Sequence, residues 1–381
     1  MADNNENKVL NVPHLRFPEF SGEWNKYTIN DLATVVGGGT PDTTVKSYWG
    51  GDIQWFTPSE IGKNKYVDFS KRTITRDGLD NSSAKLLPLH TILLSSRATV
   101  GECSIASNEC TTNQGFQSLI AKQCNIDFLY YLIQTKKKDL IRNACGSTFL
   151  EISANEIRKI KVAVPVQNEQ EQIAKLLSLI DERIATQNKI IEALKLLRDA
   201  ISGLIFNSMK NEKTILLGNV ACISNGSGDV QDSDSIKRDG WYPFFDRSEE
   251  QKWFPTYSFN REAIIYAGEG QNFFPRYYKG KFALHQRCYA ITDFCECLLP
   301  KYCLYFMNTL NSYFIRNAVG STVPSLRMDM FQKAKIKIPT IERQQEIVST
   351  LDALSLKCEN EEIVRALYNT QKSYLLQQLF I

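Results

Sequence analysis

Residues 141–148 read IRNACGST and residues 315–322 read IRNAVGST, a recurrence with one mismatch in eight. The spacing between these two copies also aligns two further segments. It places Phe128, Tyr131 and Leu132 on Tyr302, Tyr305 and Phe306, and it places KIKVAVP at 159–165 on KAKIKIP at 333–339. Such a repeat is far longer than a solenoid unit of roughly 20 to 50 residues. The sequence therefore predicts two similar modules in one chain, a pseudo-dimer that suits a partner with its own two-fold symmetry, such as duplex DNA.

A heptad pattern follows the first module after Pro165. Apolar residues dominate two heptad positions, one made of Ile173, Ile180, Gln187, Leu194 and Ile201, the other of Leu176, Arg183, Ile190, Leu197 and Leu204. This pattern is typical of a coiled coil. The alternative is an ordinary amphipathic helix lying against a globular core.

A second long helix is predicted from about Glu342. Its apolar stripe begins with Ile347, Leu351, Leu354 and Cys358, and is expected to shift at residues 359–362 and to resume at Ile363, Leu367, Thr370 and Tyr374. Because one helix follows each module, we expect the two to pair antiparallel. The predicted packing residues are Ile173, Leu176, Ile180, Ile190, Leu194, Leu197, Ile201, Leu204, Ile347, Leu351 and Leu354.

The predicted fold class is α/β (α+β), with two pseudo-repeated modules joined by two long helices that form an antiparallel coiled coil. The predicted divisions are an N-terminal arm at 1–24, modules at 25–166 and 211–340, and helical regions at 167–210 and 341–381. Within the first module we expect strands at 92–94 and 117–120 and a helix at 127–143. The second half lacks a copy of the Leu15–Phe20 motif, and its module is expected to start near Leu217.

Composition indicates a soluble, cytoplasmic protein. Hydrophobic residues make up 43% of the sequence, and the first residues do not resemble a secretion signal. No apolar run reaches the length of a membrane span, which needs about 18 residues. The ten cysteines form no Cys-X-X-Cys pair. The spacing of these cysteines is unusual for zinc sites, so we expect reduced thiols. The alternative is a zinc site at Cys295, Cys297, Cys303 and His285.

Several catalytic motifs are missing from the sequence. There are no adjacent prolines, as an adenine methyltransferase loop would require, and no Walker A sequence for ATP. The run Glu250-Gln251-Lys252 resembles the end of a nuclease motif but lacks a preceding Pro-Asp, and the three histidines have no obvious partners. We therefore expect no metal site and no catalysis by this chain.

DNA contacts are predicted where basic residues gather, although the net charge is only +3. Residues 57–97 hold seven basic residues against four acids, and residues 236–287 hold nine against six. Arginine can bind guanine, glutamine and asparagine can bind adenine, and lysine binds phosphate. The candidates are Lys63, Lys65, Lys71, Arg72, Arg76, Arg97, Asn113, Gln114, Lys237, Arg238, Arg247, Arg276, Tyr277, Tyr278, Lys279, Lys281, His285, Gln286 and Arg287. The loop Gly37–Pro41 is either a tight glycine turn or a close approach to phosphates.

Motifs along most of the chain resemble those of the specificity (S) subunits of type I restriction-modification systems. They are VPHLRFPEF at 12–20 with Trp24, GGTP at 38–41, YWGGDIQW at 48–55, TNQGF at 112–116, the passage from Gly146 to Pro165, EQEQIA at 169–174 and LLQQLF at 375–380. The resemblance implies two target-recognition domains, each reading half of a split DNA site, with the helices setting the gap.

The resemblance also implies partners. Two methyltransferase (M) subunits would bind S-adenosylmethionine and methylate adenine, and restriction (R) subunits would bring ATP and Mg²⁺, so that this chain binds no cofactor of its own. Two other classes of protein stay open at this point. One is a stand-alone coiled-coil DNA-binding protein or nuclease, and the other is a scaffold whose modules bind peptides.

Overall fold

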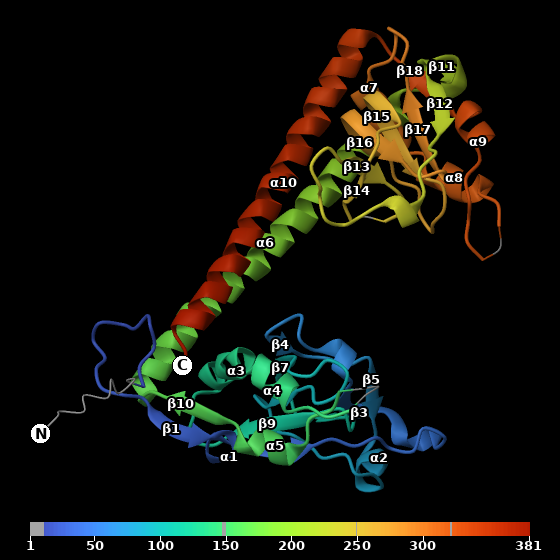
Figure 1. The fold of residues 1–381 in the computed structure, drawn as a ribbon. Coiled ribbons are helices and arrows are strands. Elements are labelled where there is room, and N and C mark those ends of the chain that lie inside the picture. The colour runs from blue at the N-terminus through green and yellow to red at the C-terminus, as the bar shows by residue number, and fades with distance from the viewer. Residues whose placement is uncertain (1–10, 147–149, 249, 321) are drawn as a thin grey trace, which may run out of the picture. The chain divides into compact units, whose positions relative to one another are not determined.

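The computed structural model describes residues 11–146, 150–248, 250–320 and 322–381 (Figure 1). The chain divides into two compact units: unit 1 comprises Met1–Asn188 and Val364–Ile381, and unit 2 comprises Lys189–Ile363. The long helices α6 (Gln167–Ser208) and α10 (Ile341–Gln378) each pass from one unit into the other. Ser147, Thr148 and Ser321 of the repeated IRNACGST motif lie outside the described residues.

Unit 1 contains a five-stranded sheet in the order β2-β9-β6-β7-β4, a three-stranded sheet β5-β3-β8 and the pair β1-β10. The strands are β1 (Asn25–Thr28), β2 (Ala33–Gly37), β3 (Trp49–Phe56), β4 (Tyr66–Val67), β5 (Arg72–Ile74), β6 (Ile92–Leu94), β7 (Cys103–Ala106), β8 (Cys110–Thr112), β9 (Gln117–Ala121) and β10 (Lys161–Val164). The short helices are α1 (Ile29–Leu32), α2 (Arg76–Asp80), α3 (Ile126–Thr135), α4 (Lys137–Arg142) and α5 (Ala154–Lys159). The strands predicted at 92–94 and 117–120 are confirmed.

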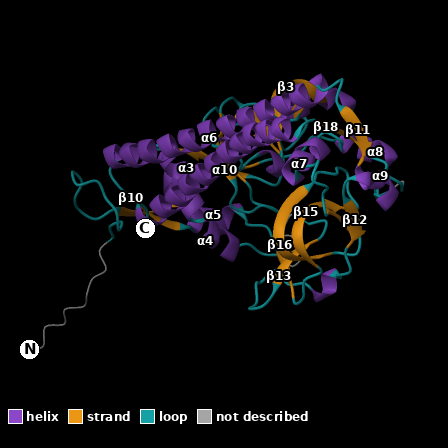
Figure 2. Cartoon of the chain, turned by 90° about the horizontal axis from the view of Figure 1, so that it is seen from above, coloured by secondary structure: helices purple, strands orange, loops and turns teal. Residues whose placement is uncertain are grey.

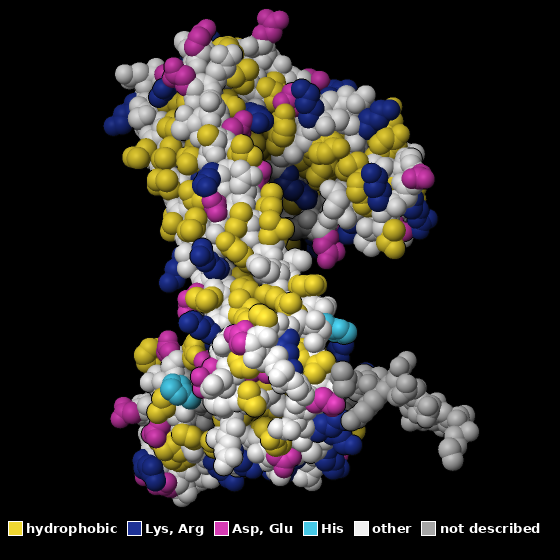
Figure 3. Space-filling view, turned by 90° about the vertical axis from the view of Figure 1, so that its left-hand side faces the viewer, with side chains coloured by type: hydrophobic (Ala, Val, Ile, Leu, Met, Phe, Trp, Pro, Cys, Tyr) yellow, Lys and Arg dark blue, Asp and Glu magenta, His cyan; other side chains and the backbone are white. Residues whose placement is uncertain are grey.

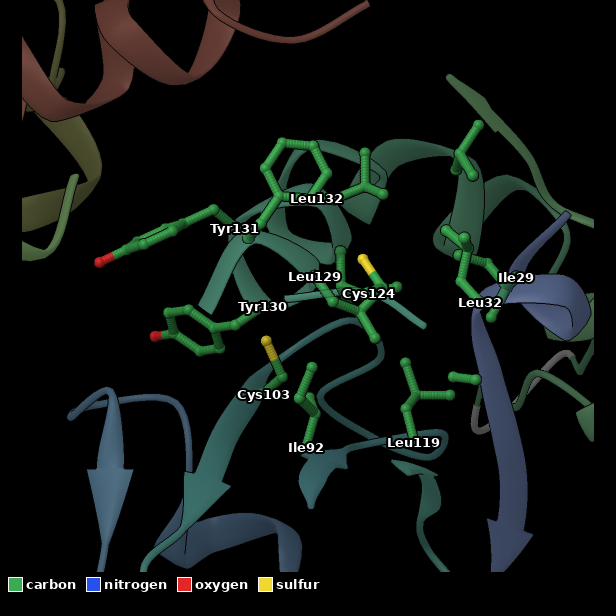
Figure 4. Packing of buried hydrophobic residues seen from close by; sticks show 14 of the residues in the cluster. Ile29, Leu32, Ile92, Cys103, Leu119, Cys124, Leu129, Tyr130, Tyr131 and Leu132 are labelled. Carbon is green, nitrogen blue, oxygen red and sulfur yellow. The ribbon is translucent and has the colours of Figure 1, made fainter. Parts of the chain in front are cut away.

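The main core of unit 1 lies between α3 and the five-stranded sheet. Figure 4 shows Leu129 of α3 close to Ile92 of β6 and Leu119 of β9, all three fully buried. The single helix predicted at 127–143 is wrong, because the backbone leaves helical geometry at Lys136 (φ −89°, ψ 7°). The break separates α3 from α4 and allows Leu140, on α4, to be fully buried in the same core.

Unit 2 contains a six-stranded sheet in the order β12-β17-β15-β16-β13-β14 and the pair β11-β18. Figure 2 shows β15 and β16 as long, curved neighbouring strands. The strands are β11 (Lys213–Leu216), β12 (Cys222–Asn225), β13 (Tyr242–Phe245), β14 (Lys252–Phe254), β15 (Phe259–Ala267), β16 (Arg276–Leu284), β17 (Cys288–Thr292) and β18 (Lys335–Ile338). The helices are α7 (Pro300–Asn308), α8 (Asn311–Asn317) and α9 (Met328–Gln332). The second module opens with a strand pair like that of the first, because β11 precedes Leu217 and pairs with β18 as β1 pairs with β10.

A buried glutamine fastens the start of each long helix to its module. The Gln170 side chain accepts a hydrogen bond from the Asn125 amide at 3.0 Å and donates one to the Pro165 carbonyl at 3.0 Å. Gln344 does the same in the second half of the chain, accepting from the Leu299 amide at 2.9 Å and donating to the Pro339 carbonyl at 2.9 Å. The repeat seen in the sequence is therefore a repeat in three dimensions.

A tyrosine and an aspartate join each module to the helix that follows it. Tyr131 donates to Asp181 at 2.7 Å, and Tyr305 donates to Asp352 at 2.7 Å. Burial, helped by the hydrogen bond to Asp352, raises the pKa of Tyr305 to about 12, and burial also raises the pKa of Tyr131. Both hydroxyls therefore stay protonated and keep donating at neutral pH.

The two long helices run side by side and antiparallel (Figure 1), as predicted. In unit 1, Asp181 pairs with Lys372 at 2.7 Å, and Asn188, further along α6, accepts from Arg365, which lies earlier in α10. In unit 2, Lys195 pairs with Glu362 at 2.6 Å. Polar pairs thus accompany the apolar contacts along this seam, where they help to set the register of the two helices.

One of the two heptad positions predicted on α6 is wrong by one residue from Arg183 onward, because Arg183 is exposed and Ile184 is half-buried. Ile190, Leu197 and Leu204 are 40%, 48% and 73% exposed, whereas Ile173 and Ile180 are buried. The second buried or half-buried position of α6 is instead made of the residues one place further along, Leu177, Ile184, Ile191, Arg198 and Ile205. Both candidate flanks contain four apolar residues in five, so spacing alone did not distinguish them. Leu176, Leu194 and Ile201 are half-buried, in keeping with the prediction.

The shift predicted in the stripe of α10 is also wrong. Ile347 and Leu351 are buried and Leu354 is half-buried, as expected, but the same heptad rhythm then continues through Glu361, Arg365, Tyr368 and Lys372. Ile363, Leu367 and Tyr374, which were expected in the seam, are 58%, 63% and 57% exposed. Charged residues occupy the seam here because they pair with Asp181, Asn188 and Lys357.

Candidate nucleic-acid interface

The same end of the sheet is built alike in both modules. In the five-stranded sheet of unit 1, the loop after β2 crosses the segment that precedes β9. In the six-stranded sheet of unit 2, the loop after β12 crosses the segment that precedes β17. A Cβ on Gly38 would lie 2.1 Å from the Asn113 carbonyl oxygen, and a Cβ on Gly226 would lie 2.0 Å from the Leu284 carbonyl oxygen. Each glycine is therefore required for close packing, which brings loops distant in the sequence together at one end of each module.

The Gly37–Pro41 loop is a packed turn. The Gly39 amide donates to the Thr112 carbonyl at 2.8 Å, and the Gly39 carbonyl accepts from the Trp55 indole at 2.9 Å. Because its amide is already bonded within the protein, Gly39 does not offer a free N–H group to a phosphate. The geometry favours the tight-turn interpretation over the phosphate-binding one.

In the first module, amide side chains lie at this end. Gln114 is exposed and bonds Thr40 at 2.5 Å, while Asn113 accepts from the Gly115 amide at 2.9 Å. Nearby, the Arg72 guanidinium lies 3.6 Å from the centre of the Trp49 ring, and this stacking holds the arginine flat. Intramolecular contacts thus position Gln114, Asn113 and Arg72 in the first module.

The other basic candidates of the first module have different surroundings. Arg76 pairs with Asp80, Arg97 pairs with Glu151, and the exposed Lys71 donates its backbone amide to Glu60. Lys63 and Lys65 line a cavity of about 750 Å³ within unit 1, between the β4 region and the long helices. The Lys65 ammonium lies 2.7 Å from Asp127 and 2.6 Å from Ser178, so it binds module to helix, and we leave it out of the proposed DNA contacts.

In the second module, four candidates line one cavity of about 400 Å³, namely Arg247, His285, Gln286 and Arg287. The cavity also contains residues that were not predicted. Asp246, only 3% exposed, pairs with Lys252 at 2.7 Å, and Glu269 pairs with Arg287 at 2.7 Å. Sequence reasoning missed these two carboxylates because it searched for an excess of basic charge.

The remaining candidates of the second module lie outside this cavity. Lys237 stacks 4.8 Å over Trp253, Arg238 pairs with Asp234, and Lys281 lies 4.8 Å from the centre of the Tyr257 ring. Tyr277 donates to Glu262, which Lys279 also approaches at 3.8 Å. Tyr278 contacts Phe245 and Phe282 in the core, and Arg276 bonds backbone carbonyls.

Comparison with known proteins assigns the family. The model of the type I restriction modification DNA specificity domain matches residues 21–196 and again residues 209–366. The chain belongs to this family. Each match begins at a module and extends into the helix that follows it, so two specificity domains account for the repeat found in the sequence.

Curated relatives carry names that agree with this assignment. The MjaIX specificity subunit of a type I restriction enzyme from Methanocaldococcus jannaschii is 38% identical over 206 residues, which is 51% of this chain and 46% of the relative. The EcoR124I/EcoR124II specificity subunit from Escherichia coli is 29% identical over 188 residues, 47% of this chain and 45% of the relative. The matched segments thus span about half of this chain and slightly less than half of each relative.

Solved structures share the fold. The S subunit of the type I restriction-modification system from M. genitalium matches with a TM-score of 0.60 and 16% identity, covering 97% of this chain and 99% of that chain. A chain from a solved type I R-M system matches with a TM-score of 0.60 and 13% identity, covering 96% and 99%. At these identities the likeness concerns the fold alone.

The cysteines of this specificity-family chain differ from prediction at one place. Cys295 and Cys297 form a disulfide, although reduced thiols were predicted throughout. One intervening residue in a turn brings the two sulfurs together, and this arrangement was not anticipated from the spacing. Across the described ranges, no three His, Cys, Asp or Glu side chains gather as a metal site, and no helix has the length and apolar content of a membrane span.

Proposed function

We propose that this chain is the DNA specificity subunit of a type I restriction-modification complex and that it performs no catalysis of its own. Each module would read one half of a bipartite DNA site. The observation that carries the proposal is the duplicated loop end, built on equivalent glycines in both modules but bearing different polar side chains. Two modules with the same loop structure but different polar side chains suit a DNA site whose two halves differ in sequence.

Chemistry would come from partners. We propose that two methyltransferase subunits bring S-adenosylmethionine and that restriction subunits bring ATP and Mg²⁺. Lys252 of the Glu250-Gln251-Lys252 run is paired with the buried Asp246 in the described structure, which supports a structural role for it over a nuclease role.

The helical pair would set the spacing of the half-sites. Both α6 and α10 are continuous through the boundary between the units, near the contact of Asn188 with Arg365. A helix rises about 1.5 Å per residue, so one inserted heptad adds about 10 Å. That length corresponds to roughly three base pairs at about 3.4 Å each.

Inserting one heptad into each helix at this level, after Asn188 and before Arg365, should therefore widen the recognised spacer by about three base pairs. The measurement is methylome sequencing of a host that expresses the variant with its methyltransferase subunits. Both half-site sequences should stay as in the wild type, which serves as the internal control. A methylated motif with the original spacer would show that the helices do not measure the gap.

We further propose that the methyltransferase subunits dock on the exposed apolar side chains of the long helices. In unit 2, Leu196, Leu197 and Leu204 of α6 are 71%, 48% and 73% exposed, and in unit 1 Leu367 and Tyr374 of α10 are similarly exposed. Apolar side chains are visible along the helical surface in Figure 3. Large apolar groups outside the seam mark a protein contact.

Replacing Leu197 and Leu204 together with glutamate should abolish stable binding of a methyltransferase subunit to unit 2. The stability of the chain itself should change little, within about 0.5 kcal/mol per site, because neither side chain is buried. Co-purification and sedimentation measure the association. Ile236→Glu is the matched control, since Ile236 is 71% exposed but belongs to the module between β12 and β13 and not to a long helix. Unchanged binding of two methyltransferase subunits to the double variant would contradict the docking proposal.

A further inference from the structure

Among the residues that the structure describes, one cation that lines the cavity of unit 2 has no partner. Lys252 lies 2.7 Å from Asp246, and Arg287 lies 2.7 Å from Glu269, so these two cations and two carboxylates neutralise each other. The Arg247 side chain also lines the cavity and is exposed. Within the described part of the chain it has no hydrogen bond or ion pair.

The loop that carries Arg247 is held on both sides. Before it, Asp246 is buried and accepts from the Ser248 amide at 2.7 Å as well as from Lys252. Around it, the Arg276 guanidinium donates to the carbonyl of Asp246 and, at 2.9 Å, to the carbonyl of Ser248. A loop fixed in this way loses little conformational freedom when its exposed side chain binds a ligand.

Two exposed side chains at the cavity differ in what they offer a ligand: the Arg247 fork only donates hydrogen bonds, and the Gln286 amide can donate and accept. Asp246 and Glu269 each accept from a protein cation, and both of the exposed side chains lie beside them in the cavity lining. In the major groove, guanine presents two acceptors, N7 and O6, while adenine presents one acceptor and one donor and cytosine presents a donor. An arginine fork matches the guanine edge with two parallel hydrogen bonds.

We infer that Arg247 is a specificity-determining residue that reads a guanine in the half-site of the second module. The inference rests on the proposed function and assigns one residue to one base. The equivalent place in the first module is occupied differently. Phe245 pairs with Leu284 as Phe56 pairs with Thr112, so Pro58 stands where Arg247 stands in the second module. This guanine contact is therefore confined to one half-site.

The test uses the specificity subunit assembled with its methyltransferase subunits. Methylation rates are measured on duplexes in which each base pair of the second half-site is replaced in turn, for the wild type, Arg247→Ala, Arg247→Lys and Arg316→Ala. Arg316 is the matched control because it is an exposed arginine of the same unit that does not line the cavity. Thermal unfolding of each variant verifies that it is folded.

Arg247→Ala should lower kcat/KM on the cognate duplex about 5- to 140-fold, the rate equivalent of one bidentate base contact. Discrimination should disappear at a single G·C pair and persist at the others. Arg247→Lys should keep the salt dependence of binding but lose the same discrimination, since lysine retains the charge and lacks the fork. Arg316→Ala should behave as the wild type.

Three results would overturn the inference. One is an Arg247→Ala variant with the wild-type motif and rate. Another is a uniform loss on all duplexes with the salt slope reduced by about one, which identifies a phosphate contact. The third is a second half-site without a G·C pair. A wild-type complex that methylates without sequence preference would instead refute the proposed function, and the inference with it.

Discussion

Arg16→Ala is expected to destabilise unit 1 by roughly 3–5 kcal/mol, the effect of leaving one charge of a buried pair without its partner. The Glu169 side chain has no exposed surface. Arg16 binds both of its carboxylate oxygens at 2.8 Å, and the Trp24 indole adds a third hydrogen bond at 3.2 Å. Removing the guanidinium leaves a carboxylate at the start of α6 that water reaches poorly.

The pair also explains why the N-terminal arm belongs to unit 1. The amide of Leu15 donates to the carbonyl of Gln378 at 2.9 Å, so the arm contacts the end of α10 as well as the start of α6. Differential scanning calorimetry measures the change in stability, and hydrogen exchange locates it to peptides of unit 1.

The control for this prediction is the double variant Arg16→Ala with Glu169→Gln. Glutamine has nearly the same shape as glutamate but carries no charge, so the double variant should recover part of the lost stability. If the double variant is less stable than Arg16→Ala alone, the cost does not arise from an unpaired carboxylate, and the explanation is wrong.

Phe380→Ala is expected to destabilise unit 1 by roughly 3–5 kcal/mol through the cavity that it leaves. Phe380 is 5% exposed at the end of α10, and its ring lies 5.2 Å from the ring of Phe128 and 6.4 Å from that of Trp24. The truncation should weaken the attachment of the end of α10 to the core beneath α3. Amide hydrogen exchange measures this effect and should become faster in unit 1.

Phe206→Ala is the matched variant, because Phe206 holds the equivalent position at the end of α6 and is also 5% exposed. Its ring lies 5.8 Å from Tyr302 and 5.3 Å from Phe306, in the core of unit 2. Each variant should speed amide exchange mainly in its own unit. Equal changes in both units after either substitution would contradict the division of the chain into two compact units.

The repeat and the helices could be predicted because their signals are periodic and local. Identical residues such as Ile141 and Ile315 recur in one register, and the apolar stripe of α6 repeats every seven residues over a length that a turn or strand does not reach. The predicted strands at 92–94 and 117–120 were confirmed as well. Ile92, Leu93 and Leu94 form a short apolar run, which suits a buried sheet.

The candidate site was predicted less completely. Basic clusters directed attention to Arg247 and to residues 285–287, which the fold brings to one cavity, but the same criterion selected Lys65, whose ammonium lies against Asp127. It also passed over Asp246, which holds the cavity wall. Charge density in sequence does not reveal which cations have partners, because those partners lie on elements distant in the sequence, as Asp127 of α3 does for Lys65.

Sequence patterns were thus sufficient for the two modules, for the long helix after each and for their antiparallel pairing. The helices follow from spacing along one segment, and the modules and the pairing follow from the recurrence of that pattern in the second half of the chain. The buried flank of α6 depended on the fold, since Leu197 and Arg198 are adjacent and both flanks are equally apolar. Contact with α10 buries one flank and leaves the other to solvent, and that choice arises between segments far apart in the chain. The surroundings of Arg247 also depend on the fold, because Arg276 of β16 bonds the carbonyl of the neighbouring Ser248 and Glu269 pairs with Arg287. Among the described residues neither group pairs with Arg247 itself.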